Sequence, residues 1–101
     1  METQEIINEN NVLLNVSGEI DGTNVDDFDA CLNQAADKTE SLILNLEGLE
    51  YVSSAGLRVF LNMQKKMKQR GHEMVLRNVN EEVMDIFSVT GFVKLLNFET
   101  E

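Results

Sequence analysis

The segment from residue 42 to residue 57 restricts the possible folds more than any other part of the chain. It begins with the apolar run Leu42-Ile43-Leu44-Asn45-Leu46, continues through a glycine-containing loop, and ends in the pair Ser53-Ser54 before a long helical pattern. A run that is apolar almost throughout is typical of a central strand covered on both faces. The order strand, loop, serine pair and helix therefore predicts an α/β fold.

The serine pair marks the start of a helix that extends to Arg70, and Gly71 lies where a left-handed C-terminal cap belongs. One of the two serines should be the N-cap, because a serine hydroxyl accepts a backbone N–H that the helix cannot satisfy internally. A serine here either only starts the helix or is also modified or reactive, and the pattern alone leaves both open. The predicted inward face of the helix carries Val59, Phe60, Met63 and Met67.

The N-terminal part of the chain predicts a hairpin followed by a helix. Residues 3–7 and 12–17 are short apolar-rich segments joined by a polar turn, and the second alternates as a half-buried strand does. A loop is expected over residues 18–23, and Thr23 with Asp26 resembles a capping box that opens a helix ending near residues 37–38. The predicted inward face of that helix carries Val25, Phe28, Leu32 and Ala35.

After Gly71, residues 73–76 predict a further strand, and Asn80 is a suitable N-cap for a short third helix with Ile86 and Phe87 inward. Residues 93–98 fit either an edge strand or a closing helix. We therefore expect one domain over residues 1–101, with an antiparallel N-terminal hairpin, then parallel strands, in a mixed sheet of four to five strands with three to four helices.

Two loops are expected to share one edge of this sheet. The loop after the second strand contains Asp21, and the loop after the third contains Ser53 and Ser54. Because sites in such sheets lie at the carboxyl ends of parallel strands, we expect the functional face there. Asp21 has an alternative interpretation as a turn-forming residue beside Gly22.

Charge and composition exclude several classes of partner for this chain. The net charge of −10 argues against nucleic acid and anionic membranes as direct partners, since both require a positive surface. No apolar run approaches the length of a membrane span, and the acidic N-terminus lacks the features of a secretory signal. The single cysteine, Cys31, forms no internal disulfide. These features suit a cytoplasmic protein.

The sequence does not suggest an enzyme. It contains no glycine-rich loop followed by lysine that would cradle phosphates, so no nucleotide cofactor is expected. The only histidine, His72, is predicted at the far end of the helix that follows the serines, too far to act as their base. It has no cysteine or carboxylate cluster at metal spacing, so no metal is expected.

Several segments together resemble the STAS domain family, and within it the stand-alone bacterial anti-sigma-factor antagonists. The resemblance covers essentially the whole chain, and these segments carry it: Leu44-Asn45-Leu46, Tyr51-Val52-Ser53-Ser54-Ala55-Gly56-Leu57, Gly71-His72-Glu73-Met74-Val75-Leu76 and Thr90-Gly91-Phe92. The family motif is usually Asp-Ser-Ser-Gly-Leu, and its first serine is phosphorylated. Aligning Gly56-Leu57 with it implies that Ser54 is the phosphoacceptor, although Ser53 replaces the usual Asp, Ala55 the second Ser, and Arg58 a small residue found in many members.

The resemblance implies that the unphosphorylated domain binds a serine kinase that is also an anti-sigma factor, so that a sigma factor is released. Phosphorylation of Ser54 would end this binding, and a serine phosphatase would restore it. The residues implied to bind the partner are Asp21, Ser53, Ser54, Gly56, Leu57 and Arg58. The alternative is a constitutive adaptor or scaffold subunit of a signalling assembly or transporter, in which Ser54 is only a cap.

Overall fold

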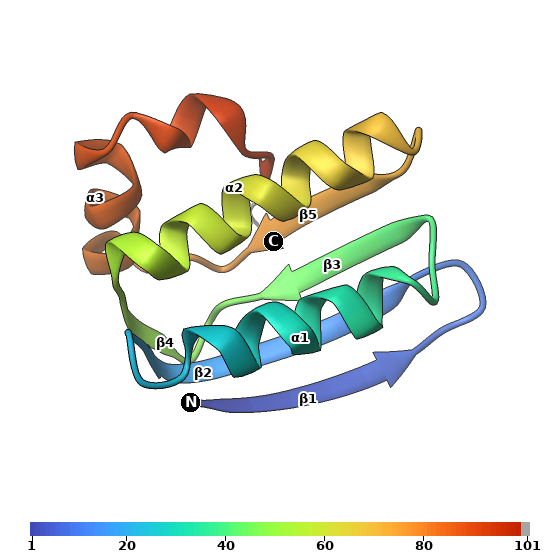
Figure 1. The fold of residues 1–101 in the computed structure, drawn as a ribbon, viewed down its shortest axis with the longest axis horizontal. Coiled ribbons are helices and arrows are strands. Elements are labelled where there is room, and N and C mark those ends of the chain that lie inside the picture. Colours follow the sequence, from blue (N-terminus) through green and yellow to red (C-terminus); the bar gives the residue numbers. More distant parts are fainter. Residues whose placement is uncertain (100–101) are drawn as a thin grey trace.

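The computed structural model describes residues 1–99 and confirms the predicted α/β fold (Figure 1). Three α-helices, one 3-10 helix and six strands make up this part of the chain. In chain order they are β1 (Glu2–Ile7), β2 (Val12–Ile20), α1 (Val25–Ala36), β3 (Ser41–Asn45), β4 (Leu49–Val52), α2 (Ser54–Gln69), β5 (Glu73–Arg77), α3 (Glu81–Val89), η1 (Phe92–Leu95) and β6 (Phe98–Glu99).

The sheet has the order β1-β2-β3-β5-β6, and β4 pairs separately with the end of β2. The β1–β2 pair is antiparallel, whereas the β2–β3, β2–β4, β3–β5 and β5–β6 pairs are parallel. An antiparallel hairpin followed by parallel strands was the predicted arrangement. The strand β4 is additional, because residues 49–52 were expected to belong to the loop before the serines. Similarly, β2 continues to Ile20 through an irregularity at Gly18 instead of ending at Ser17.

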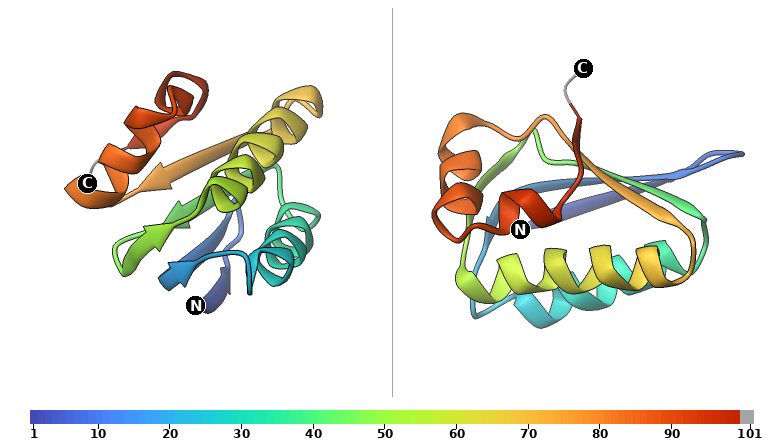
Figure 2. Two further views of the ribbon diagram at one scale, coloured as in Figure 1. Left: turned by 60° about the vertical axis from the view of Figure 1, so that its left-hand side comes forward. Right: turned by 90° about the horizontal axis from the view of Figure 1, so that it is seen from above.

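Helices α1 and α2 lie side by side on one face of the sheet (Figure 2). In β3, Leu42 and Leu44 are fully buried under these helices, while Ile43 on the opposite face is only half-buried. The prediction that this strand is covered on both faces was therefore wrong. The strand alternates, as expected when a sheet is packed on one face only, although its outward residue is also apolar.

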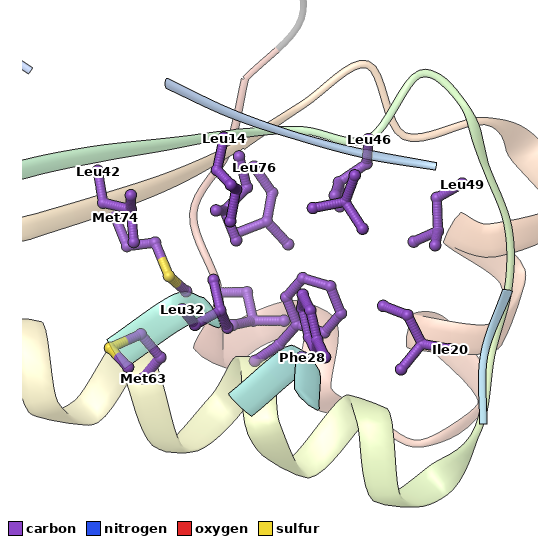
Figure 3. Close-up of a cluster of buried hydrophobic side chains, with 14 of the residues drawn as sticks. Leu14, Ile20, Phe28, Leu32, Leu42, Leu46, Leu49, Met63, Met74 and Leu76 are labelled. Atoms are coloured by element: carbon purple, nitrogen blue, oxygen red, sulfur yellow. The ribbon is translucent and has the colours of Figure 1, made fainter. Parts of the chain in front are cut away.

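The core lies between the sheet and the two helices. Figure 3 shows Leu14, Leu46 and Leu76 pointing from the sheet toward Phe28 and Leu32 of α1. A row of four phenylalanine rings crosses this core, with centroid separations of 5.0 Å from Phe28 to Phe60, 5.4 Å from Phe60 to Phe87 and 5.5 Å from Phe87 to Phe98. The tilted and edge-on contacts are favourable for aromatic pairs, so the row joins α1, α2, α3 and β6.

The beginning of α2 rests directly on the ends of β2 and β4. Gly56 is buried in the first turn, and a Cβ atom added to it would lie 2.7 Å from Val52 Cγ2 and 2.9 Å from Ile20 Cγ2. Both neighbours are methyl groups of β-branched side chains, which have little freedom to move aside. The absence of a side chain at Gly56 therefore sets how closely the helix approaches the two strands.

Two helix starts were predicted from caps, with different outcomes. Asn80 caps α3 as expected, since its side chain accepts a hydrogen bond from the Val83 N–H. The proposed capping box of Thr23 and Asp26 was wrong, because α1 has Asn24 at its N-cap position and no side-chain cap bond. The Thr23 hydroxyl donates to Asp21 Oδ1 instead, at 2.5 Å.

At the other end of the chain, residues 93–98 were expected to form either an edge strand or a closing helix. Residues 92–99 contain both a short helix and a short strand, η1 and β6.

The packing of Gly56 predicts the effect of a methyl group at this position. Gly56→Ala should lower the free energy of unfolding by about 1–3 kcal/mol, the usual cost of overpacking, despite the better helix propensity of alanine. Urea denaturation followed by circular dichroism measures this. Gly22→Ala is the matched control, because no atom lies within 4 Å of a Cβ there, and it should change stability by less than about 0.5 kcal/mol. Equal stabilities of the two variants would contradict the packing argument.

Candidate functional site

The candidate site lies where the ends of β2 and β4 meet the beginning of α2. Ile20 pairs with Val52 in the parallel β2–β4 ladder, and the Ser53 N–H extends the ladder by donating to the Ile20 carbonyl at 2.8 Å. Asp21 directly follows Ile20 in the chain, as Ser53 follows Val52. The two loops predicted to share an edge of the sheet are therefore adjacent.

Ser53 is the N-cap of α2. Its backbone is extended, with φ −78° and ψ 170°, and its Oγ accepts a hydrogen bond from the Gly56 N–H at 3.2 Å. Its carbonyl accepts the first bond of the helix, from the Leu57 N–H at 2.9 Å. The capping function predicted for one of the two serines thus belongs to Ser53, which is half-buried.

Ser54 is the first residue of α2 and is exposed. Its hydroxyl forms no hydrogen bond with any residue in the range 1–99 that the structure describes. The first N–H groups of a helix have no partner within the helix, and here the Ser53 side chain satisfies only that of Gly56. A free hydroxyl therefore lies beside the unpaired N–H groups of Ser54 and Ala55, at the positive end of the helix dipole.

Asp21 forms the turn that leads from β2 into α1. Its Oδ1 accepts hydrogen bonds from the backbone N–H of Thr23 at 2.8 Å and from the Thr23 hydroxyl. Both hydrogen bonds stabilise the charged carboxylate, the hydroxyl bond most, and they therefore lower the pKa of the Asp21 carboxyl below its ordinary value. The turn-forming interpretation of Asp21 is therefore correct. The carboxylate is negatively charged at neutral pH, and its Oδ2 accepts no hydrogen bond from the described residues.

Gly56 and Leu57 were both predicted to contact a partner directly, but both are buried, and the Leu57 side chain is only 1% exposed. The reason is helix geometry, because one turn of α2 places these two residues on the face that packs against the strands. The close backbone approach at Gly56 is to Ile20 and Val52 within the domain. These two residues thus support the site from beneath.

An apolar hollow of about 300 Å³ lies next to Ser54, between β4, α2 and α3. Two large side chains on its rim are unusually exposed for apolar residues, Tyr51 at 44% and Val89 at 87%. In the sequence analysis Tyr51 appeared only as part of the family motif, and Val89 was not singled out. One feature of the sequence could have pointed to Val89. It lies three residues after Ile86, so the two residues share one side of α3, and Ile86 also lines the hollow. The lining residues are Tyr51, Val52, Ser54, Leu57, Ile86, Val89 and Thr90.

Arg58, which the resemblance implied as a partner-binding residue, is exposed one turn after Ser54. It forms neither a hydrogen bond nor an ion pair with any of the first 99 residues. It is also separated from the other basic residues of α2, which begin at Lys65. The site thus combines a free hydroxyl, an apolar hollow, one carboxylate and one cation.

Two further features bear on the chemistry of the described residues. Residues 1–99 contain no cluster of three histidine, cysteine, aspartate or glutamate residues arranged to hold a metal ion. No helix in the same part of the chain is both long and apolar enough to span a membrane.

Comparisons with known proteins agree with the resemblance noted in the motifs. The family model described as STAS domain matches residues 2–101. BtrV of Bordetella bronchiseptica, assigned as an anti-sigma factor antagonist, is 35% identical over 81 residues, covering 79% of this chain and 70% of BtrV. The anti-sigma-B factor antagonist of Bacillus subtilis is 29% identical over 94 residues, covering 93% of this chain and 86% of the relative.

The fold is also similar to that of the anti-sigma factor antagonist SpoIIAA of Bacillus. Its unphosphorylated form superposes with a TM-score of 0.79 at 21% identity, covering 99% of this chain and 90% of SpoIIAA. Its phosphorylated form superposes with a TM-score of 0.73 at 20% identity, covering 99% and 93%. At such low identity this likeness establishes the fold alone. The match of the STAS domain model over nearly the full length shows that this chain belongs to the STAS domain family.

Proposed function

We propose that this chain is an anti-sigma factor antagonist that is controlled by phosphorylation of Ser54. The observation that carries the proposal is the division of roles between the two serines. Ser53 caps the helix, so the Ser54 hydroxyl is exposed and has no structural bond to lose when it is modified. The names of the relatives support the first part, since BtrV and the Bacillus subtilis protein are both assigned as antagonists. SpoIIAA, described in a phosphorylated form, supports the second.

In this proposal the unphosphorylated domain binds a serine kinase that is also an anti-sigma factor. The apolar hollow receives an apolar group of the kinase, and the exposed rings and methyl groups of Tyr51 and Val89 lose water on binding. Ser54 lines the hollow, and Arg58 follows it by one turn of α2. Ser53 and Asp21 follow the paired ends of β4 and β2. These four residues supply polar contacts. Occupation of the kinase by this domain releases the sigma factor, so the effect on transcription needs no contact with DNA.

The kinase transfers the γ-phosphoryl group of ATP to Ser54 Oγ. A bond between Oγ and phosphorus forms, the bond between the γ-phosphorus and the bridging oxygen breaks, ADP leaves, and a base of the kinase takes the hydroxyl proton. The phosphate adds a charge of about −1.5 to −2 at neutral pH. Within the domain this charge is tolerated, because the first turn of a helix favours anions.

At the interface the same phosphate is unfavourable. It occupies the rim of a hollow that is apolar, and it adds negative charge to a chain that already carries −10. Desolvation and like-charge repulsion then weaken binding to the kinase without a change of fold. A serine phosphatase removes the phosphate and restores binding. The proposed setting of this cycle is the cytoplasm, and the domain is a substrate in it and not an enzyme.

The proposal predicts a single phosphate on Ser54. After incubation with ATP and the serine kinase encoded nearest to the gene, intact and peptide mass spectrometry should find one phosphate per chain. Ser54→Ala should abolish it. Ser53→Ala should retain it while losing about 1 kcal/mol of stability in urea denaturation, because only the cap is removed.

Other outcomes of this experiment have clear meanings. A phosphate that is retained in Ser54→Ala and lost in Ser53→Ala would show that the motif is aligned one residue out of place. A chain that no serine kinase of its host phosphorylates, and whose Ser54→Ala variant signals normally, would contradict the switch and favour a constitutive adaptor.

The hollow predicts a second effect. Val89→Asp should weaken binding of the unphosphorylated domain to the kinase by at least about tenfold, because it puts a charge into the apolar interface. Isothermal titration calorimetry measures this. Ile7→Asp is the matched control, since Ile7 is 64% exposed and is the last residue of β1, a strand that ends far from the beginning of α2 (Figure 1). Binding of this variant should be unchanged. Equal affinities of the two variants would exclude the hollow from the interface.

A further inference from the structure

The position of Arg58 relative to Ser54 suggests a second element of the switch. The two residues are separated by four positions on α2, which places them on the same side of the helix with Cβ atoms about 5–6 Å apart. Both are exposed. An arginine side chain is long enough to reach back over one turn to a group attached to the serine Oγ.

The Arg58 guanidinium has no competing partner among residues 1–99. Three of the cations on other elements or at helix ends are paired, Lys38 with Glu5, Arg70 with Asp37 and Arg77 with Glu99. Among residues 1–99, Lys65, Lys68 and Lys94 share with Arg58 the lack of an ion pair, but Arg58 alone of these lies within one turn of Ser54. Arg58 pairs with none of the residues 1–99, although the chain contains 18 acidic residues and 8 basic ones. Its own helix offers no carboxylate, because residues 54–69 contain neither Asp nor Glu.

We infer that Arg58 forms an ion pair with the phosphate of phosphorylated Ser54 across one turn of α2. This inference rests on the proposed modification of Ser54 and adds a role for a second residue. A guanidinium group presents paired N–H donors that match two phosphate oxygens. The unpaired N–H groups of Ser54 and Ala55 lie on the other side of the phosphate, so the anion is held between the helix terminus and the arginine.

The ion pair changes what phosphorylation does to the binding surface. In the unphosphorylated domain Arg58 is an exposed cation one turn after Ser54, available to an acidic group of the partner. In the phosphorylated domain the same guanidinium is bound to the phosphate. Modification therefore adds an anion to the surface and also neutralises the cation one turn away on the same helix. The partner loses one favourable contact and meets one unfavourable charge.

The test uses the full chain with phosphoserine placed at position 54 by genetic encoding, so that no kinase is needed. The second ionisation of the phosphate is followed by ³¹P NMR over a pH series. A nearby cation favours the dianion, so Arg58→Gln should raise the second pKa of the phosphate by roughly 0.15 to 0.4 unit. Arg58→Lys should recover part of this shift, since it keeps the charge but not the paired donors.

Lys65→Gln is the matched control on the same helix. It removes one exposed charge at about 16 Å from Ser54, beyond the screening length at physiological salt, and should leave the pKa of the phosphate unchanged. A second readout is the ¹H–¹⁵N signal of Arg58 Nε, which should shift with the same midpoint as the phosphorus signal. In the chain without phosphate this signal should show no such shift.

Equal phosphate pKa values in the unchanged chain and in Arg58→Gln, or an Arg58 Nε signal that does not follow the titration, would overturn the ion pair. Neither result depends on whether a kinase recognises the domain. Failure of this inference is therefore distinguishable from failure of the proposed function, which is decided by phosphorylation of the natural serine.

Discussion

The close contact between the first turn of α2 and the ends of β2 and β4 is the constraint on which the site depends. Gly56 has no side chain, so the helix rests on the methyl groups of Ile20 and Val52. At this separation the Ser53 N–H reaches the Ile20 carbonyl, and the Ser53 hydroxyl reaches the Gly56 N–H. One packing contact thus fixes the end of a strand, the cap of a helix and the exposure of Ser54.

Most of the fold could be predicted because local patterns and tertiary packing agree. The helices α1 and α2 follow from apolar spacing, and α3 from its Asn80 cap. The strand β4 could not be predicted, because its four residues Leu49–Val52 do not alternate, and only pairing with β2 makes them a strand. The capping box at Thr23 failed for a similar reason, since Asp21 takes the hydroxyl that the box would have used.

The site was predictable as a location but not in detail. The proximity of Asp21 to the serines follows from the rule for parallel strand ends, yet the sequence does not decide which serine is the cap. That choice depends on where the β2–β4 ladder ends, which places Ser53 at the helix boundary. The exposure of Val89 and the burial of Leu57 depend on how three elements converge. No single stretch of sequence contains that information.

The row of phenylalanine rings also determines when the site is completed during protein synthesis. The chain leaves the ribosome from its N-terminus, so Phe60 can pack against Phe28 before Phe87 and Phe98 have emerged. Ser54 is already outside the ribosome at that stage, but α3, which forms one wall of the hollow beside it, is not. A partner that recognises both the serine and the hollow will therefore engage finished domains and pass over nascent ones.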